Sequence, residues 1–127
     1  MIPFEEIWEK YIFIAAYGMV TASENKTFGQ ILEDKELSET VKGIMREIAE
    51  IAKKREVNLP ATIIEDSFNK AKNFPYETKT SFQRDFEQTD KPNERELFGD
   101  TIIRLGEAAG VETVNTKLVN DKIKSMR

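Results

Sequence analysis

Four polar residues of this sequence have the types and positions that acid–base chemistry needs: Lys10, Ser81, Asp85 and Glu94. The chain contains no His and no Cys, so the commonest general base and the thiolate nucleophile are both excluded. Lys10 is the last charged residue before a long apolar run, and Glu94 stands at the start of an amphipathic segment. A lysine and a carboxylate from separate helices could meet across a cleft as a proton donor and an orienting anion.

Each of these residues also has a purely structural interpretation, and the sequence leaves both interpretations open. Lys10 could be a surface lysine whose stem covers apolar neighbours. Glu94 could occupy the first helical position because the helix macrodipole favours an anion there, by about 0.3–1 kcal/mol. Ser81 could serve only the first turn of a helix, and Asp85 could simply pair with a nearby basic residue.

A long N-terminal helix is the element that must position Lys10. Pro3 is favoured in the first turn of a helix, and the apolar pattern predicts a helix that extends to about Ala22. From Tyr11 onward the segment is apolar almost all round, which is typical of a buried, central helix. Lys10 would then either reach the surface along its stem or point into a cleft at the edge of the core. Three aromatic residues of this helix are predicted to belong to the core: Trp8, Tyr11 and Tyr17.

Two further helices are predicted from their capping residues. Thr27 and Gln30 form a capping box that opens a short helix ending at Leu32. Asp34 caps a longer helix over residues 35–55, whose apolar residues recur at near-ideal helical spacing. The charged residues on the other face of that helix are predicted to be solvated. These are Glu39, Lys42, Arg46, Glu47, Glu50, Lys53 and Lys54.

The second half of the chain is also predicted to be helical. A helix over 61–73 has Ile64, Phe68 and Ala71 as its inner stripe, and residues 75–79 form a loop. Thr80 caps the next helix, and Asn93 caps a helix that ends at Ala109, before Gly110. The apolar face of that helix comprises Phe98, Ile102, Leu105 and Ala109. A last helix from Val114 is predicted to bury Leu118, Val119, Ile123 and Met126.

No segment shows the alternation of a β-strand, so the predicted fold class is all-α. The architecture expected is an irregular bundle of about six to seven helices around the buried N-terminal helix. A chain of 127 residues fits one helical domain, 1–127, with a single core.

Composition excludes several functional classes. The net charge is −4 and no Lys/Arg cluster could follow a phosphate backbone, so no nucleic-acid partner is expected. The longest uncharged apolar run, 11–22, is too short to span a bilayer, so no membrane partner is expected either. The absence of Cys excludes disulfides and thiolate metal sites and suits a cytoplasmic location. No metal site is predicted, and no G-x-G-x-x-G or P-loop offers a cradle for cofactor phosphates.

Three blocks of the sequence resemble the C-terminal domain of ketopantoate reductases. The first block contains S-F-Q-R-D-F-E, K-P-N-E-R-E-L-F-G-D-T-I-I-R-L-G and G-V-E-T-V-N, and is similar to the family pattern S-M-x-x-D, P-T-E, V-V-R-L-G and G-V-x-T-P-x-N. The opening W-E-K-Y-I-F-I-A-A-Y resembles the family's W-x-K helix, and the segment from G-Q-I-L-E-D to I-A resembles its middle helix. The resemblance covers nearly the whole chain. It implies a fold like the C-terminal domain of 6-phosphogluconate dehydrogenase.

The resemblance also implies an activity, the NADPH-dependent reduction of ketopantoate to pantoate. The cofactor would be bound by an N-terminal Rossmann domain that this chain does not contain. The family's general acid corresponds to Lys10, the glutamate that contacts that lysine and the substrate corresponds to Glu94, and a substrate-binding serine corresponds to Ser81. The start of the chain near the family's domain boundary favours a domain separated from a longer reductase. Alone, it is expected neither to bind NADPH nor to turn over.

Two positions depart from the ketopantoate-specific pattern. Members with that specificity carry asparagines four and eight residues after the lysine, where this chain has Ile14 and Gly18. Each lost polar contact costs about 1–3 kcal/mol, so another 2-oxo acid is a reasonable substrate. The expected partners are the Rossmann domain, a small 2-oxo acid and a second copy of the chain as a homodimer. The alternative is a non-catalytic helical module for protein interaction or dimerisation.

Overall fold

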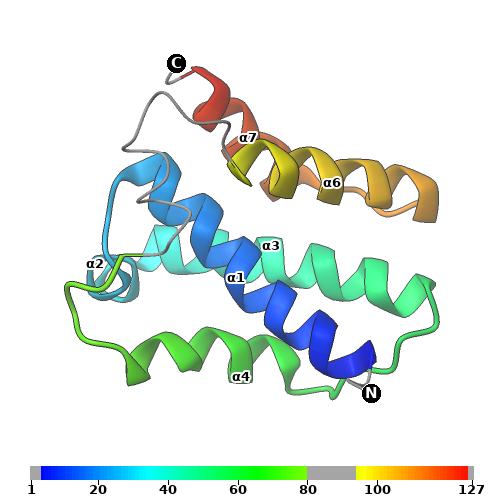
Figure 1. Ribbon diagram of the computed structural model, residues 1–127, viewed down its shortest axis with the longest axis horizontal. Coiled ribbons are helices and arrows are strands. Elements are labelled where there is room, and N and C mark those ends of the chain that lie inside the picture. The colour runs from blue at the N-terminus through cyan, green and yellow to red at the C-terminus, as the bar shows by residue number, and fades with distance from the viewer. Residues whose placement is uncertain (1–3, 80–93, 126–127) are drawn as a thin grey trace.

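The computed structural model describes residues 4–79 and 94–125, and for residues 4, 5 and 94–98 it describes the backbone alone. The described residues form six α-helices and one 3-10 helix, and none of them lies in a β-strand (Figure 1). The prediction of an all-α bundle is therefore confirmed. The elements are α1 (Phe4–Glu24), α2 (Phe28–Glu33), α3 (Lys35–Lys54), α4 (Ile63–Asn69), the 3-10 helix η1 (Lys70–Asn73), α6 (Glu94–Ala109) and α7 (Val114–Ser125).

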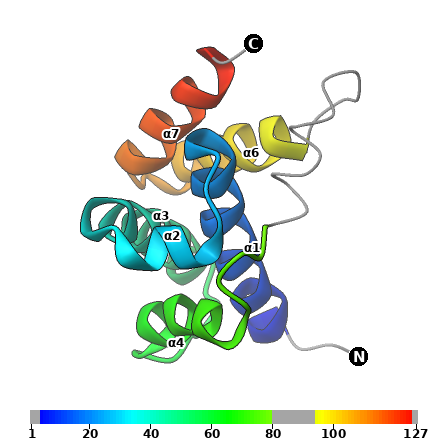
Figure 2. The same cartoon turned by 90° about the vertical axis from the view of Figure 1, so that its left-hand side faces the viewer.

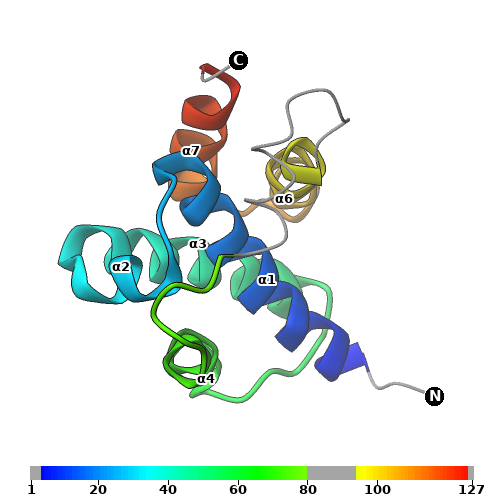
Figure 3. The same ribbon diagram turned by 60° about the vertical axis from the view of Figure 1, so that its left-hand side comes forward.

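Helices α1 and α3 form the centre of the molecule. They pack across each other, with α4 on one side of the pair and α6 and α7 together on the other (Figures 1 and 3). The short α2 connects the C-terminal end of α1 to the start of α3 (Figure 2). Most of the fully buried large side chains come from the two central helices: Ile12, Tyr17, Met19 and Val20 in α1, and Ile44, Met45, Ile48 and Ile51 in α3.

One stripe of α1 is left uncovered by the helices that the structure describes. Ile7 and Ile14 are 50% and 49% exposed, and Lys10 between them is exposed as well. These residues follow one another at intervals of three and four, so they share one side of the helix. The prediction of a helix buried all round from Tyr11 onward is therefore wrong at Ile14. The neighbouring helices α3, α4, α6 and α7 pack against the other sides of α1.

The capping predictions around α2 and α3 are confirmed. The side chain of Gln30 accepts from the Thr27 backbone at 2.9 Å, and the Thr27 hydroxyl accepts from the Gln30 backbone at 3.3 Å. Asp34 accepts a hydrogen bond of 3.0 Å from the backbone N–H of Leu37, which is unpaired within the first turn of α3. Short-range side-chain chemistry thus sets where both helices begin.

The predicted helix over 61–73 is present with a later start and a tighter end. Residues 61 and 62 form a turn, so the α-helical part begins at Ile63, and the last residues adopt 3-10 geometry. Ile63 lies in the core at 7% exposure and Ile64 is only partly buried, whereas Phe68 and Ala71 are buried as predicted. The Tyr17 hydroxyl fixes this segment to α1 by donating to the Phe68 carbonyl at 2.6 Å.

The α6–α7 pair closes the other side of the core. Gly110 has φ of 72°, and the next residue, Val111, donates to the Gly106 carbonyl at 2.8 Å, as in a glycine-terminated helix end. Ile102, Val119 and Ile123 are buried as predicted. The prediction that α7 buries Leu118 is wrong: this side chain is 65% exposed, because the inner face of α7 is occupied by Thr116, Val119, Asn120 and Ile123.

Some predictions fall outside the described residues. These are the helix capped by Thr80, the capping role of Asn93, and the burial of Phe98 and Met126.

Candidate active site

Lys10 lies in the N-terminal half of α1 and is exposed on the uncovered stripe. It makes no ion pair with the side chains that the structure describes. The sequence left open whether Lys10 reaches the surface or points into a cleft at the edge of the core. In this chain it lies at the surface. Its ammonium is available to a ligand or to a further part of a longer protein.

The structure describes the other predicted site residues only in part. Glu94 is the first residue of α6, as predicted, and its backbone is described while its side chain is not. Ser81 and Asp85 lie outside the described residues. The structure therefore brings α6 against α1 without testing whether the Lys10, Glu94 and Ser81 side chains meet.

Two tyrosines close to Lys10 in the sequence are poor proton donors at neutral pH. Burial raises the pKa of Tyr11 to about 12. Burial also raises the pKa of Tyr17 well above its ordinary value, and its hydroxyl is held by the Phe68 carbonyl. Both phenols stay protonated across the physiological range, and Glu6 and Lys10 are the exposed ionisable side chains described in this part of α1.

A buried carboxylate that the sequence analysis misplaced on the solvated face joins α3 to α7. Glu47 is 9% exposed. One carboxylate oxygen accepts from the backbone N–H and the side-chain amide of Asn115, at 2.8 and 2.9 Å. The other accepts from the backbone N–H and the hydroxyl of Thr116, at 2.9 and 2.6 Å. Glu47 thus satisfies first-turn donors of α7, and the positive end of the helix dipole favours its charge.

The signal for Glu47 was present in the sequence. It stands three residues after Ile44 and four before Ile51, a spacing that places it on the apolar side of α3. Gly43, one turn earlier, allows the close approach of α7: a Cβ atom at this position would lie 2.5 Å from the side-chain nitrogen of Asn115. The role of this cluster is to position α7.

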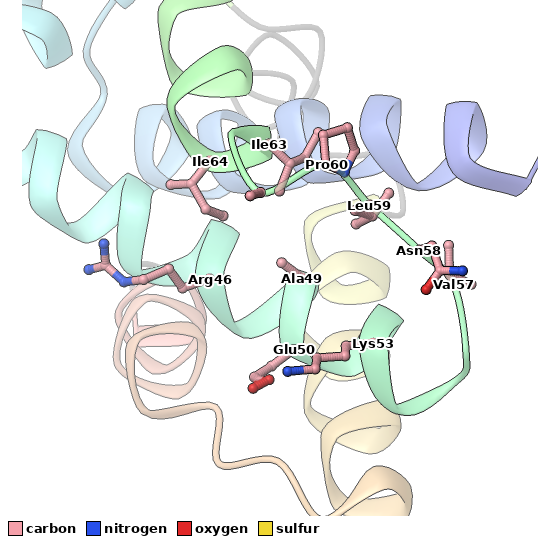
Figure 4. A pocket seen from close by; sticks show the side chains of 11 residues that line it. Arg46, Ala49, Glu50, Lys53, Val57, Asn58, Leu59, Pro60, Ile63 and Ile64 are labelled. Atoms are coloured by element: carbon pink, nitrogen blue, oxygen red, sulfur yellow. The ribbon is translucent and has the colours of Figure 1, made fainter.

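A shallow groove lies between α3 and the segment that leads into α4. Its volume is about 390 Å³, and α3, the connector after it and the start of α4 form its walls (Figure 4). Arg46, Glu50 and Lys53 line one edge, with Leu59 and Ile64 opposite (Figure 4). None of the predicted site residues lines it. The groove is therefore separate from the Lys10 stripe.

The described residues offer neither a cluster of metal ligands nor a membrane-spanning helix. Within 4–79 and 94–125, no group of three or more carboxylates is placed to hold a metal ion. No helix in these ranges is long and apolar enough to cross a membrane. The described helices also lack a glycine-rich turn after a strand, the feature that holds a dinucleotide pyrophosphate.

Comparison with known proteins places this helical domain, with its surface lysine on α1, in a class of reductases. Residues 4–127 match the family model described as ketopantoate reductase PanE/ApbA C terminal. The chain belongs to this family. That match does not favour the alternative of a non-catalytic interaction module.

Individual relatives agree with the family match. The Bacillus subtilis (strain 168) protein described as uncharacterized oxidoreductase YkpB is 32% identical over 118 residues, which cover 90% of this chain and 39% of that protein. The structure of 2-dehydropantoate 2-reductase from Methylococcus capsulatus superposes with a TM-score of 0.83 at 26% identity, over 96% of this chain and 38% of that one. A ketopantoate reductase from Staphylococcus aureus, described as dimeric, gives a TM-score of 0.85 at 16% identity, over 95% of this chain and 42% of that one. This last likeness shows the fold alone. The chain thus spans about two-fifths of the length of these relatives.

Proposed function

We propose that this chain is the substrate-binding C-terminal part of an NADPH-dependent reductase that converts a 2-oxo acid, ketopantoate in the family, to the 2-hydroxy acid. The observation that carries the proposal is the family match over residues 4–127, together with 32% identity to an oxidoreductase. The exposed position of Lys10 on α1 is consistent with a group that meets a ligand. A cytoplasmic location remains part of the proposal.

Lys10 is the proposed general acid. Reduction of a 2-oxo acid adds a hydride to the carbonyl carbon and a proton to the carbonyl oxygen, and the nicotinamide cofactor supplies the hydride. A lysine ammonium beside that oxygen stabilises the developing negative charge and then donates the proton. The ammonium also attracts the anionic substrate before reaction.

Glu94 and Ser81 complete the proposed site. Glu94 begins α6, and α6 packs against α1, so its carboxylate would orient the Lys10 ammonium from the neighbouring helix. Ser81 would hold the substrate by a hydrogen bond from its hydroxyl. Substitution of either residue in the full-length protein, with circular dichroism to check folding, tests this part of the proposal.

Two macromolecular partners are proposed for this chain: a Rossmann domain and a second copy of the chain. A Rossmann domain would hold the cofactor, because this chain has no phosphate-binding turn of its own. A homodimer is also proposed, since the exposed Val114 and Leu118 of α7, at 55% and 65%, form the kind of apolar surface that subunit contacts use.

The proposal is tested with the protein encoded by the full reading frame. NADPH oxidation is followed with ketopantoate and other 2-oxo acids, comparing wild type with Lys10→Ala. Loss of a general acid lowers kcat by about 10²–10⁴-fold. The matched control is Lys54→Ala, another lysine that is exposed on a central helix but lies away from the uncovered stripe. We expect it to retain wild-type rates.

Two results would contradict the proposal. One is a Lys10→Ala enzyme that turns over as fast as wild type. The other is a reading frame that encodes no strand followed by G-x-G-x-x-G ahead of this domain, since the interaction-module alternative would then be preferred.

A further inference from the structure

One buried asparagine joins α7 to the first half of α6. Asn120 of α7 is 2% exposed, and its side-chain amide donates to the Asp100 carboxylate of α6 at 3.0 Å. Lys124, one helical turn further along α7, donates to the same carboxylate oxygen at 3.0 Å. Two donors of α7 therefore hold one acceptor of α6, and the two helices lie side by side (Figure 1).

The same asparagine lies directly against the backbone of α6 at Gly99. A Cβ atom at Gly99 would overlap the side-chain oxygen and the Cγ atom of Asn120, and would lie 3.0 Å from its Cβ atom. These separations are shorter than a van der Waals contact, so a side chain at position 99 would force α6 or Asn120 to move. Because Asn120 is buried, it has little room to move. The missing side chain of Gly99 thus sets how closely the two helices approach.

Stability alone does not explain an asparagine at position 120. Its side-chain oxygen is buried and has no hydrogen-bond partner within the part of the chain that the structure describes. A buried acceptor without a partner destabilises the folded state, and an aliphatic residue would avoid this cost. Single buried polar side chains are best known for fixing the register of packed helices. Asn120 is therefore better suited to fix the position of α6 than to stabilise the fold.

Helix α7 is itself fixed to both central helices. Glu47 of α3 accepts hydrogen bonds from the first turn of α7, and Glu24 of α1 forms an ion pair with Lys122. Ile123 of α7 is fully buried in the core. Helix α7 thus provides a fixed support against which α6 is placed.

Gly99 is close to the proposed site. It follows Glu94 by five residues of the same helix, so the two residues are about 7.5 Å apart along the helix axis. Helix α6 also packs against α1, which carries Lys10. A shift of α6 at Gly99 would therefore change the separation between the two residues that the proposed mechanism brings together.

We infer that Gly99 and Asn120 are positioning residues for catalysis: their contact sets the place of α6 from which Glu94 orients Lys10. The inference rests on the proposed function, because it takes Lys10 as the proton donor and Glu94 as its partner. It goes further by giving a catalytic consequence to a contact between α6 and α7. Neither Gly99 nor Asn120 touches the substrate, and both act through the placement of α6.

The test measures kcat and KM of the full-length enzyme with NADPH, starting with ketopantoate and continuing with the 2-oxo acid that wild type reduces fastest. Gly99→Ala adds the methyl group that overlaps Asn120. A displacement of about 1 Å near a reacting centre can cost about a hundredfold in rate. We expect kcat to fall about ten- to a hundredfold and KM to change by less than about threefold, because orientation is lost while the substrate still binds.

Two double variants separate positioning from simple destabilisation. Asn120→Ala removes the amide that the new methyl group meets, so adding it to Gly99→Ala should raise kcat again by at least about tenfold. In a Glu94→Ala background, Gly99→Ala should lower kcat by less than a further factor of about three, since the residue that it displaces is gone. Asn120→Ala alone adds no atoms, so it tests the same contact if Gly99→Ala does not fold, and its kcat should fall at least about threefold.

The matched control is Gly43→Ala, which makes the same change at a glycine of α3 that faces another asparagine of α7. A Cβ atom at Gly43 would lie 2.5 Å from the side-chain nitrogen of Asn115. Asn115 is only partly buried, so its side chain can turn outward while α6 keeps its place. We expect a lower Tm and a kcat within about threefold of wild type. Circular dichroism shows whether each variant is folded.

The outcomes distinguish the inference from the function on which it rests. Wild-type kcat in folded Gly99→Ala and Asn120→Ala enzymes overturns the inference and leaves the reductase intact. So does a loss of kcat in Gly99→Ala that Gly43→Ala matches, that Asn120→Ala does not relieve, or that persists without the glutamate at position 94. If wild type reduces no 2-oxo acid at all, the proposed function itself fails.

Discussion

Single residues decide how distant helices of this domain are joined, and Glu47, which joins α3 to α7, is the clearest case. Its carboxylate accepts four hydrogen bonds from Asn115 and Thr116 at the start of α7. Thr116 is fully buried, so its two donors have no access to bulk water if the carboxylate is removed. A buried donor without a partner costs about 1–3 kcal/mol. The contribution of Glu47 to stability is therefore expected to be large for one side chain.

Glu47→Ala should lower the free energy of unfolding by about 2–4 kcal/mol, because at least two backbone N–H groups lose their acceptor. The measurement is urea unfolding followed by circular dichroism. Glu50→Ala is the matched control, since Glu50 is an exposed glutamate three residues further along α3, and it should change stability by less than about 0.5 kcal/mol. Equal effects of the two substitutions would show that the α7 contact contributes nothing.

At the scale of elements, the start of α3 depends on one side chain. Asp34 accepts from the Leu37 N–H at 3.0 Å and so pairs a donor that the helix itself leaves unpaired. Asp34→Ala should lower the free energy of unfolding by about 0.5–2 kcal/mol. Asp34→Asn still caps the helix and should keep most of the wild-type stability. Thermal unfolding of the three proteins measures the difference. A loss in the Asn variant as large as in the Ala variant would assign the effect to charge, including the weak approach of Lys26 at 3.9 Å.

The helices that could be predicted from the sequence are those whose signals are local. The caps at Thr27 and Asp34 act over three residues, and the end at Gly110 depends on one backbone angle that glycine adopts easily. Such features are complete within a short window of sequence. They do not depend on where the rest of the chain goes.

The incorrect predictions concern contacts between distant parts of the chain. Glu47 is bonded to residues 68 and 69 positions away, and nothing within α3 specifies which helix will pack there. Leu118 and Ile14 both have apolar spacing, yet each lies on a side that no described helix covers. Ile63 is buried although the predicted inner stripe of this helix began at Ile64. Periodicity identifies a face, and packing decides which face is inside.

At the scale of the whole molecule, two observations favour a further domain beside this one: the exposed stripe of α1, and the greater length of the relatives. This chain matches about two-fifths of the B. subtilis and M. capsulatus proteins. Its helices form a core of their own, centred on α1 and α3. This domain is therefore expected to fold around its own core, and under the proposed function cofactor binding would require a separate part that holds the pyrophosphate.

This separation predicts opposite responses to NADPH. A ligand at 100 times its Kd stabilises the protein that binds it by about 2.7 kcal/mol, so NADPH should raise the Tm of the full-length protein. Chain 1–127 alone should unfold cooperatively, as its buried core requires, and its Tm should not change with NADPH, because it contains no G-x-G-x-x-G turn. Differential scanning fluorimetry over a range of NADPH concentrations measures both responses, with NADPH-free samples of each protein as controls. A concentration-dependent rise in the Tm of chain 1–127 would place part of a cofactor site on these helices and would contradict the proposal that a separate Rossmann domain holds the cofactor.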